Sequence, residues 1–94
     1  FMINTSATLA ASSKEIANTV KSRHAMQEET LGLFLRQRQQ RGEIPAQCET
    51  DRLAQYLNCV LQGMSISARE GATLEKLQSI TRTTLHLWPE LIKM

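Results

Sequence analysis

The side chains best suited to bind a metal are two cysteines and two histidines, Cys48, Cys59, His24 and His86. No two of them have the CxxC or HxxxH spacing of a zinc site, and they fall on different predicted elements. We therefore expect no metal, no other cofactor and no disulfide framework, as in a reducing cytosolic compartment. A redox-sensing role for Cys59 is the alternative, although cysteine is more often a small buried residue.

Neither a catalytic nucleophile nor a phosphate site is indicated by the remaining polar residues. Ser65 lacks the second glycine of a nucleophile elbow, sits within a predicted helix and has no accompanying base and carboxylate pattern. Arg36, Arg38 and Arg41 fall near a helix end, where cations offset the helix dipole, and no aromatic residues interleave with them. The sequence therefore predicts a protein that is not an enzyme.

Ligand binding is better supported, by polar residues on apolar helix faces. A buried polar group needs a partner, so Asn4, Thr5 and Thr8 would bond either a ligand or the backbone. His24 lies on the apolar stripe of a long helix. It would serve either as a polar anchor for a ligand in a cavity or simply as a half-buried histidine at the edge of the stripe. His86 is expected to be exposed. The predicted ligand-binding residues are Asn4, Thr5, Thr8, His24, Gln27 and Leu31.

Composition indicates one domain, residues 1–94. Hydrophobic residues make up 41% and charged residues 21%, as in soluble globular proteins, and 94 residues bury a modest core. The net charge of +2 is too small to imply a polyanionic partner. No stretch approaches 18 apolar residues, so we expect nothing to span a membrane, and the two cysteines are expected to be reduced thiols of a cytoplasmic protein. Because Phe1 stands within an apparent helix, we expect the chain to be a piece of a longer protein.

The hydrophobic pattern has a helical period and no strand-like alternation, which predicts an all-α fold of about four helices. The first would be the later part of a helix, and Ser12 with Glu15 forms a capping-box pattern that would start the second. The expected helices cover residues 1–11, about 13–41, 51–71 and 73 to about 88.

Local signals mark the ends of these helices. Gly42 can take the left-handed position after the long helix, and Pro45 prevents it from resuming. Thr50 is the expected N-cap of the third helix and Thr73 that of the fourth. Pro89 would end or kink the fourth helix.

The helix over 51–71 has two useful faces. Its expected core stripe consists of Leu53, Leu57, Val60, Leu61, Met64 and Ala68. Beside this stripe runs a row of small residues that includes Gly63, and a glycine within a helix costs about 1 kcal/mol relative to alanine. We therefore expect another helix to approach there, from a second copy of the domain. The predicted dimer interface comprises Tyr56, Cys59, Gly63, Ile66, Ser67, Leu77, Thr81, Thr84 and Trp88.

Several short motifs share an order with a known family. They are Gly42-Glu43-Ile44-Pro45 after an arginine-rich turn, Leu53-Ala54, Leu61-Gln62-Gly63-Met64 and Ala68-Arg69-Glu70-Gly71. In this order they resemble the C-terminal domain of the TetR family of bacterial transcriptional repressors, over nearly the whole chain. Cys48 departs from the pattern, since the family often has an acidic residue there.

The resemblance implies an antiparallel helical bundle that binds a small, usually apolar or aromatic effector and forms a homodimer. Helices 51–71 and 73–88 would pair with their copies as a four-helix bundle, and 1–11 with 13–41 would enclose the pocket. The family's DNA-binding helix-turn-helix would precede this domain and is absent, so the chain alone should not bind an operator. An effector would shift the long helix and the spacing of two DNA-binding heads. The alternative is a stand-alone helical module whose second face binds a different protein.

Overall fold

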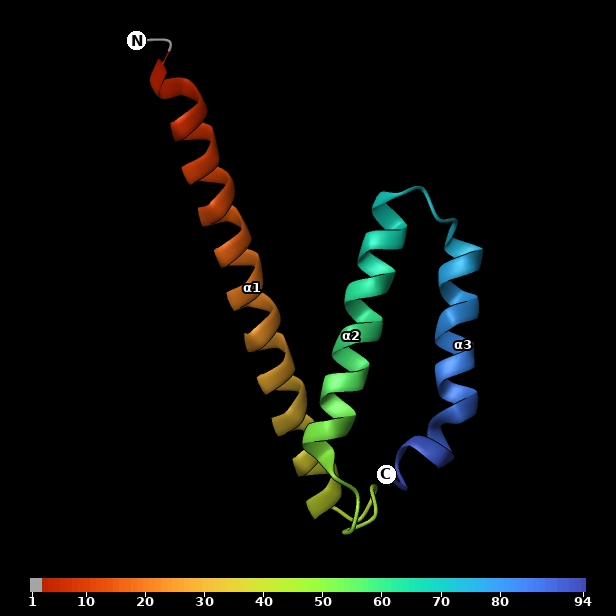
Figure 1. Cartoon of the computed structure of the whole chain (residues 1–94). Helices are drawn as coiled ribbons and strands as arrows, with labels where there is room; N and C mark the ends of the chain where they lie inside the picture. Colours follow the sequence, from red (N-terminus) through yellow and green to blue (C-terminus); the bar gives the residue numbers. More distant parts are fainter. Residues whose placement is uncertain (1–2) are drawn as a thin grey trace.

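The computed structural model describes residues 3–94, and their side chains from Ala10 onward. Its helices are α1 (Ile3–Gln40), α2 (Thr50–Arg69) and α3 (Leu74–Leu91). Figure 1 shows α1 and α2 diverging in a V from their connecting loop, with α3 returning beside α2. The described part of the chain contains no strand, which agrees with the predicted all-α class.

The break predicted between the first two helices is absent. α1 runs without interruption from Ile3 to Gln40, and Ser12 and Glu15 are exposed within it. No glycine or proline lies near Ser12, and the neighbouring alanines favour continuation of the helix, so a capping-box pattern alone does not start a new one. The described residues therefore form three helices instead of about four.

The predicted end of α1 at Gly42 is confirmed. Gly42 has φ of +80°, and its N–H donates to the carbonyl of Gln39 at 3.0 Å. The N–H of Glu43 donates to the carbonyl of Arg38, also at 3.0 Å, which completes a Schellman motif. Gly71, with φ of +94°, follows α2 in the same way.

The predicted helix starts have different outcomes. Thr73 caps α3 as expected, because its Oγ1 accepts a hydrogen bond from the Lys76 N–H at 3.1 Å. The N-cap of α2 is Glu49 and not Thr50, and no side chain caps the helix there. Thr50 is instead the first helical residue and is 6% exposed, so its side chain is committed to packing.

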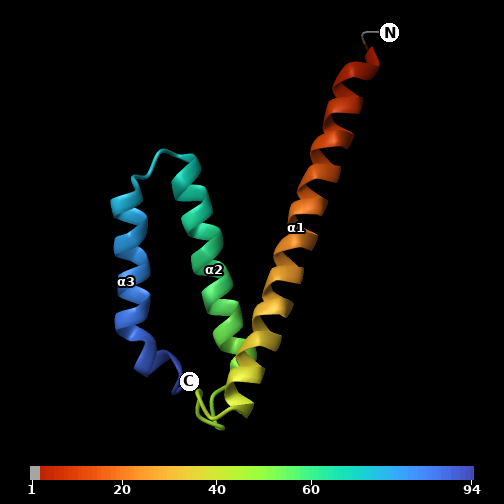
Figure 2. The same cartoon turned by 180° about the vertical axis from the view of Figure 1, so that it is seen from behind.

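Pro89 lies inside α3, which continues to Leu91 and does not end at Trp88. Proline removes one helical hydrogen bond and bends a helix without necessarily ending it. Figure 2 shows the last turn of α3 bending back toward the loop between α1 and α2. This bend brings Leu91 and Ile92 against the core.

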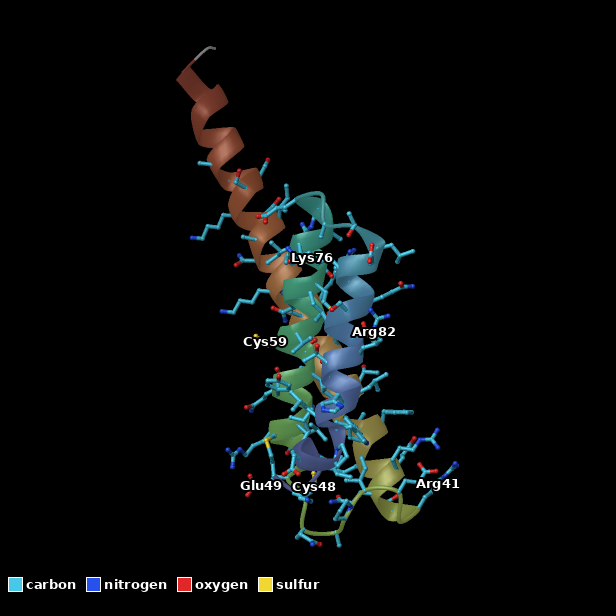
Figure 3. The ribbon with its side chains drawn as sticks, turned by 90° about the vertical axis from the view of Figure 1, so that its right-hand side faces the viewer. Arg41, Cys48, Glu49, Cys59, Lys76 and Arg82 are labelled. Atoms are coloured by element: carbon cyan, nitrogen blue, oxygen red, sulfur yellow. The ribbon has the colours of Figure 1, made fainter. Side chains whose placement is uncertain are left out.

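The core lies where the loop meets the ends of the helices. The buried residues Leu35, Ile44, Cys48, Leu53 and Ala54 form it, with Leu31, Leu57, Trp88, Leu91 and Ile92 packed around them. The amide of Gln39 holds the loop by donating to the carbonyls of Pro45 and Cys48, both at 2.9 Å. The Glu49 N–H donates to the Met94 carbonyl at 2.9 Å, which joins the C-terminus to the loop. Figure 3 shows Cys48 and Glu49 at this end.

At the end of α1 farthest from the connecting loop, no other helix covers the side chains. Residues 10–23 of α1 are all exposed, including the apolar residues Ile16 and Val20. The chain is consequently elongated, with extents of 62 × 30 × 16 Å. Within residues 3–94, no helix combines the length and apolar character that crossing a bilayer requires.

Candidate functional site

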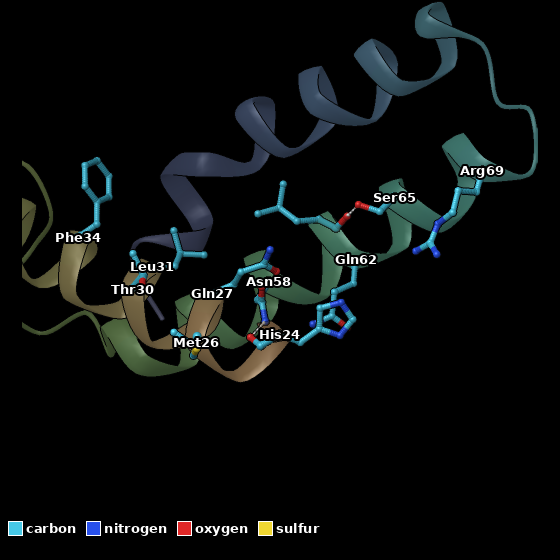
Figure 4. A pocket seen from close by; sticks show the side chains of 11 residues that line it. His24, Met26, Gln27, Thr30, Leu31, Phe34, Asn58, Gln62, Ser65 and Arg69 are labelled. Carbon is cyan, nitrogen blue, oxygen red and sulfur yellow. Dashed lines mark hydrogen bonds between the residues drawn. The ribbon is translucent and has the colours of Figure 1, made fainter. Parts of the chain in front are cut away.

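A groove of about 740 Å³ opens where α1 and α2 diverge (Figure 4). The α1 wall includes His24, Gln27, Leu31 and Phe34. The α2 wall consists of Asn58, Leu61, Gln62, Ser65 and Arg69. The volume falls within the roughly 300–1,000 Å³ of small-molecule sites, and mostly apolar walls with a few polar groups are typical of such sites.

The structure brings together half of the ligand-binding residues expected from the sequence. His24, Gln27 and Leu31 line the groove from successive turns of α1, because residues three and four apart share a helix face. His24 is half-buried, whereas His86 is exposed, as predicted. The side chains of Asn4, Thr5 and Thr8 lie outside the described residues.

Asn58 is a groove residue that the sequence analysis missed. It is 2% exposed, and its Nδ2 donates a hydrogen bond to the main-chain carbonyl of His24 at 3.1 Å. This bond joins α2 to α1 across the groove. A signal was available, since Asn58 interrupts the apolar residues Leu57, Val60 and Leu61 of α2, and buried asparagine requires partners.

The second side-chain atom of Asn58 lacks a partner. Among the described residues, Asn58 Oδ1 is buried and accepts no hydrogen bond. The amide cannot be reversed, because that would place Oδ1 against the His24 carbonyl, with two acceptors facing each other. Asn58 therefore carries a buried acceptor without a partner, in a fixed orientation, and this atom is not accessible from the groove.

The close approach of helices occurs at Gly32 and not at Gly63. A Cβ built on Gly32 would lie 3.6 Å from Asp51 Oδ1 and 3.8 Å from the Ala54 Cβ, whereas one on Gly63 would meet nothing within 4 Å. Gly32 is buried between α1 and α2, below the groove. Within this chain, then, the small residues that let two helices meet are Gly32 and Ala54.

The predicted dimer residues separate into two groups. Tyr56, Cys59, Gly63 and Ile66 are exposed on α2, with Tyr56 at 43% and Ile66 at 52%. Figure 3 shows Cys59 projecting from the side of α2. These residues recur at three- and four-residue spacing, so they form one outward face of the helix. That face stays uncovered in the single chain.

The other predicted dimer residues are half-buried, except for Thr81, which is exposed. Thr81 and Thr84 line an apolar cavity of about 180 Å³ between α3 and α2. Trp88 packs against the core of its own chain. Ser67 and Leu77 are half-buried. The four half-buried side chains are therefore partly covered within their own chain, which the helical pattern alone did not reveal.

The expected core stripe of α2 is covered only at its lower end. Leu53 is fully buried, and Leu57, Val60 and Met64 are half-buried. Leu61 is 54% exposed and Ala68 is exposed, contrary to the prediction. The reason is geometric, since α1 has diverged from α2 at this height and leaves Leu61 in the groove wall.

Two of the three arginines form ion pairs, and of the two free cysteines Cys48 is buried and Cys59 is exposed. Arg36 pairs with Asp51 at 2.8 Å and Arg38 with Glu43 at 3.3 Å, both exposed pairs at the packed end. Burial, aided by the charge of Glu49, raises the pKa of the Cys48 thiol, which disfavours the reactive thiolate. No group of three His, Cys, Asp or Glu residues in the described part of the chain could hold a metal ion.

The chain is 67% identical over 93 residues to the HTH-type transcriptional repressor ComR of Escherichia coli strain K12. The match covers 99% of this chain and 44% of ComR, so the chain spans less than half the length of that relative. No protein-family model matches the chain. No solved structure matches it either. The printed name of this relative, a transcriptional repressor, agrees with the regulatory part of the prediction.

Proposed function

We propose that this chain is the effector-binding and dimerisation domain of a TetR-like bacterial transcriptional repressor in the cytoplasm. The observation that carries the proposal is the 67% identity to a protein named as an HTH-type repressor, over 99% of the chain. Because the match covers 44% of that relative, its remaining length leaves room for a separate DNA-binding region. DNA binding would belong to that region.

The groove between α1 and α2 is the proposed effector site. His24, Gln27 and Leu31 supply one wall, and the bond from Asn58 to the His24 carbonyl connects that wall to α2. A ligand in the groove would change the angle between the helices, while the core below acts as the fixed end. The size of the shift is limited by the ligand's difference in affinity for the two arrangements.

The uncovered part of α1 would transmit this change. Residues 10–23 are exposed along their whole length. At 1.5 Å per residue, the roughly 20 helical residues before His24 extend about 30 Å beyond the groove. A small rotation at the groove therefore becomes a larger displacement at the far end of α1, where it could alter the spacing of two DNA-binding heads.

The outward face of α2, together with α3, is the proposed dimer interface. No residue of α3 is fully buried, and Leu74 and Leu85 are 71% and 63% exposed. With Tyr56 and Ile66 they supply apolar surface that a second copy would cover. A stable interface of this kind buries at least about 1,200 Å² in total, which two helices per subunit can provide.

A chimera tests the proposal directly. The matching segment of E. coli ComR would be replaced by residues 1–94 and expressed in a strain that lacks ComR. We expect transcripts that rise on loss of ComR to return to the wild-type level, while ComR truncated before the segment leaves them raised. A folded chimera that restores none of these transcripts would instead favour a stand-alone helical interaction module.

A further inference from the structure

The basic side chains of the groove lie together at one end of it. Of the residues that line the groove, only His24 and Arg69 are basic, and none is acidic. His24 is the first lining residue along α1, and Arg69 is the last along α2. Because α1 enters the connecting loop and α2 leaves it, both residues lie at the end of the groove farthest from that loop (Figure 4).

The guanidinium of Arg69 is available to a ligand. Arg69 is exposed, and none of the ion pairs among the described side chains includes it. Glu70, the next residue, lines a hollow at the start of α3, and Glu28, one turn after His24, lines a separate hollow between α1 and α2. A cation in the last turn of α2 stabilises the helix, but that effect does not require its side chain to face the groove, as this one does.

The opposite end of the groove is apolar. Leu31, Leu61 and Phe34 supply apolar surface, and Figure 4 shows Phe34 at the far end from His24 and Arg69. His24 and Phe34 are ten residues apart on α1, which corresponds to about 15 Å at 1.5 Å per helical residue. The groove is therefore elongated, with hydrogen-bond donors at one end and an aromatic ring at the other.

We propose that the groove binds a small, elongated apolar molecule with one anionic group, which pairs with Arg69 while the apolar part lies toward Phe34. This inference rests on the proposed effector-binding function and names the class of effector. Charge complementarity carries the choice, because a guanidinium binds a carboxylate through two parallel N–H···O bonds. His24 and Gln62 line the same end and can each donate a further N–H. A cationic effector would meet Arg69 with no acidic side chain in the lining to offset the repulsion.

Two probes with the same apolar body isolate the charge. 6-Phenylhexanoate ends in a carboxylate, whereas 6-phenylhexanamide has a neutral amide at that position. Each would be titrated into the 15N-labelled 94-residue chain while the amide shifts of residues 24–34 and 58–69 are followed by NMR. Because charge-assisted hydrogen bonds are stronger than neutral ones, we expect the carboxylate to bind about tenfold more tightly. Added sodium chloride should reduce this preference, since salt screens an exposed ion pair.

Variants assign the preference to Arg69. Arg69→Gln removes the charge and keeps a hydrogen-bonding side chain, so the preference for the carboxylate should fall to near unity. Arg82→Gln is the matched control, because Arg82 is exposed on α3 outside the groove and its substitution removes the same charge; it should keep the preference. Both positions are exposed, so both variants should fold, which circular dichroism checks.

The remaining outcomes separate this inference from the proposed function. Equal affinity of the two probes for the groove would overturn the selection of anions and leave an effector site in place. A preference that both variants reduce equally would also overturn it, because net charge alone would then be the cause. Absence of groove shifts with both probes at millimolar concentration would overturn the inference and remove support for the groove as the effector site. Dimerisation and repression by the chimera would be unaffected by any of these results.

Discussion

The two ends of the α1–α2 pair differ in how the chain covers its own apolar residues. At the loop end, Leu35, Leu53 and Ala54 are buried, and the bent end of α3 closes over them. At the other end, Ile16 and Leu61 are 65% and 54% exposed. The first arrangement stabilises the fold, whereas the second leaves side chains free to meet a ligand or another chain. Substitutions should therefore act on stability at one end and on binding at the other.

The largest effect on stability is expected at Leu53, which is 0% exposed. Leu53→Ala removes buried methyl groups and leaves a cavity, so it should lower the free energy of unfolding by about 2–5 kcal/mol. Leu61→Ala, on the same helix but in the groove wall, should lower it by less than about 1 kcal/mol. Urea unfolding followed by circular dichroism measures both. Equal losses would mean that the groove end is as well packed as the core.

Glycine-to-alanine substitutions should change stability in opposite directions at Gly32, within α1, and at Gly42, just after it. Gly42 has φ of +80°, so Gly42→Ala forces alanine into a left-handed conformation and should cost about 1–2 kcal/mol. Gly32 is helical, and its added Cβ would make ordinary contacts at 3.6 and 3.8 Å. Gly32→Ala should therefore raise stability by about 0.5–1 kcal/mol through helix propensity. The same unfolding assay tests this, and a loss at Gly32 would show that α1 and α2 lie closer than these distances.

The smallest expected effect concerns the buried thiol at the packed end. The pKa of Cys48 is raised above its usual value of 9.0 by burial and by Glu49. The folded state thus retains the proton longer than the unfolded state, so this contribution to stability is complete below about pH 9 and is lost as the pH rises through the folded pKa. Unfolding of the Cys59→Ala variant between pH 8 and 10 should show a decline that Cys48→Ala reduces. Identical pH profiles would contradict a buried, protonated Cys48.

Signals within a few residues predicted the local structure well. Gly42 and Thr73 act as expected because a left-handed glycine and a capping hydroxyl depend only on the backbone of residues next to them in the sequence. The capping-box pattern at Ser12 failed, since it is compatible with an uninterrupted helix. Thr50 failed as a cap because tertiary packing buries it.

The site was predictable in part, for a related reason. The spacing of His24, Gln27 and Leu31 places them on one face of a helix, whatever packs against it. Asn58 and Gly32 gain their roles only from the position of the other helix, which periodicity does not specify. Leu61 was assigned to the core because the pattern could not reveal where α1 and α2 separate.

The solution mass of this chain tests the proposed dimer most directly. Light scattering over a dilution series should give about twice the chain mass of 10.6 kDa, and Gly63→Leu should shift the population to monomer by blocking the exposed face of α2. Thr19→Leu, on exposed α1, is the control and should stay dimeric. A monomer at every concentration, or a Gly63→Leu variant that remains fully dimeric, would contradict the proposed interface.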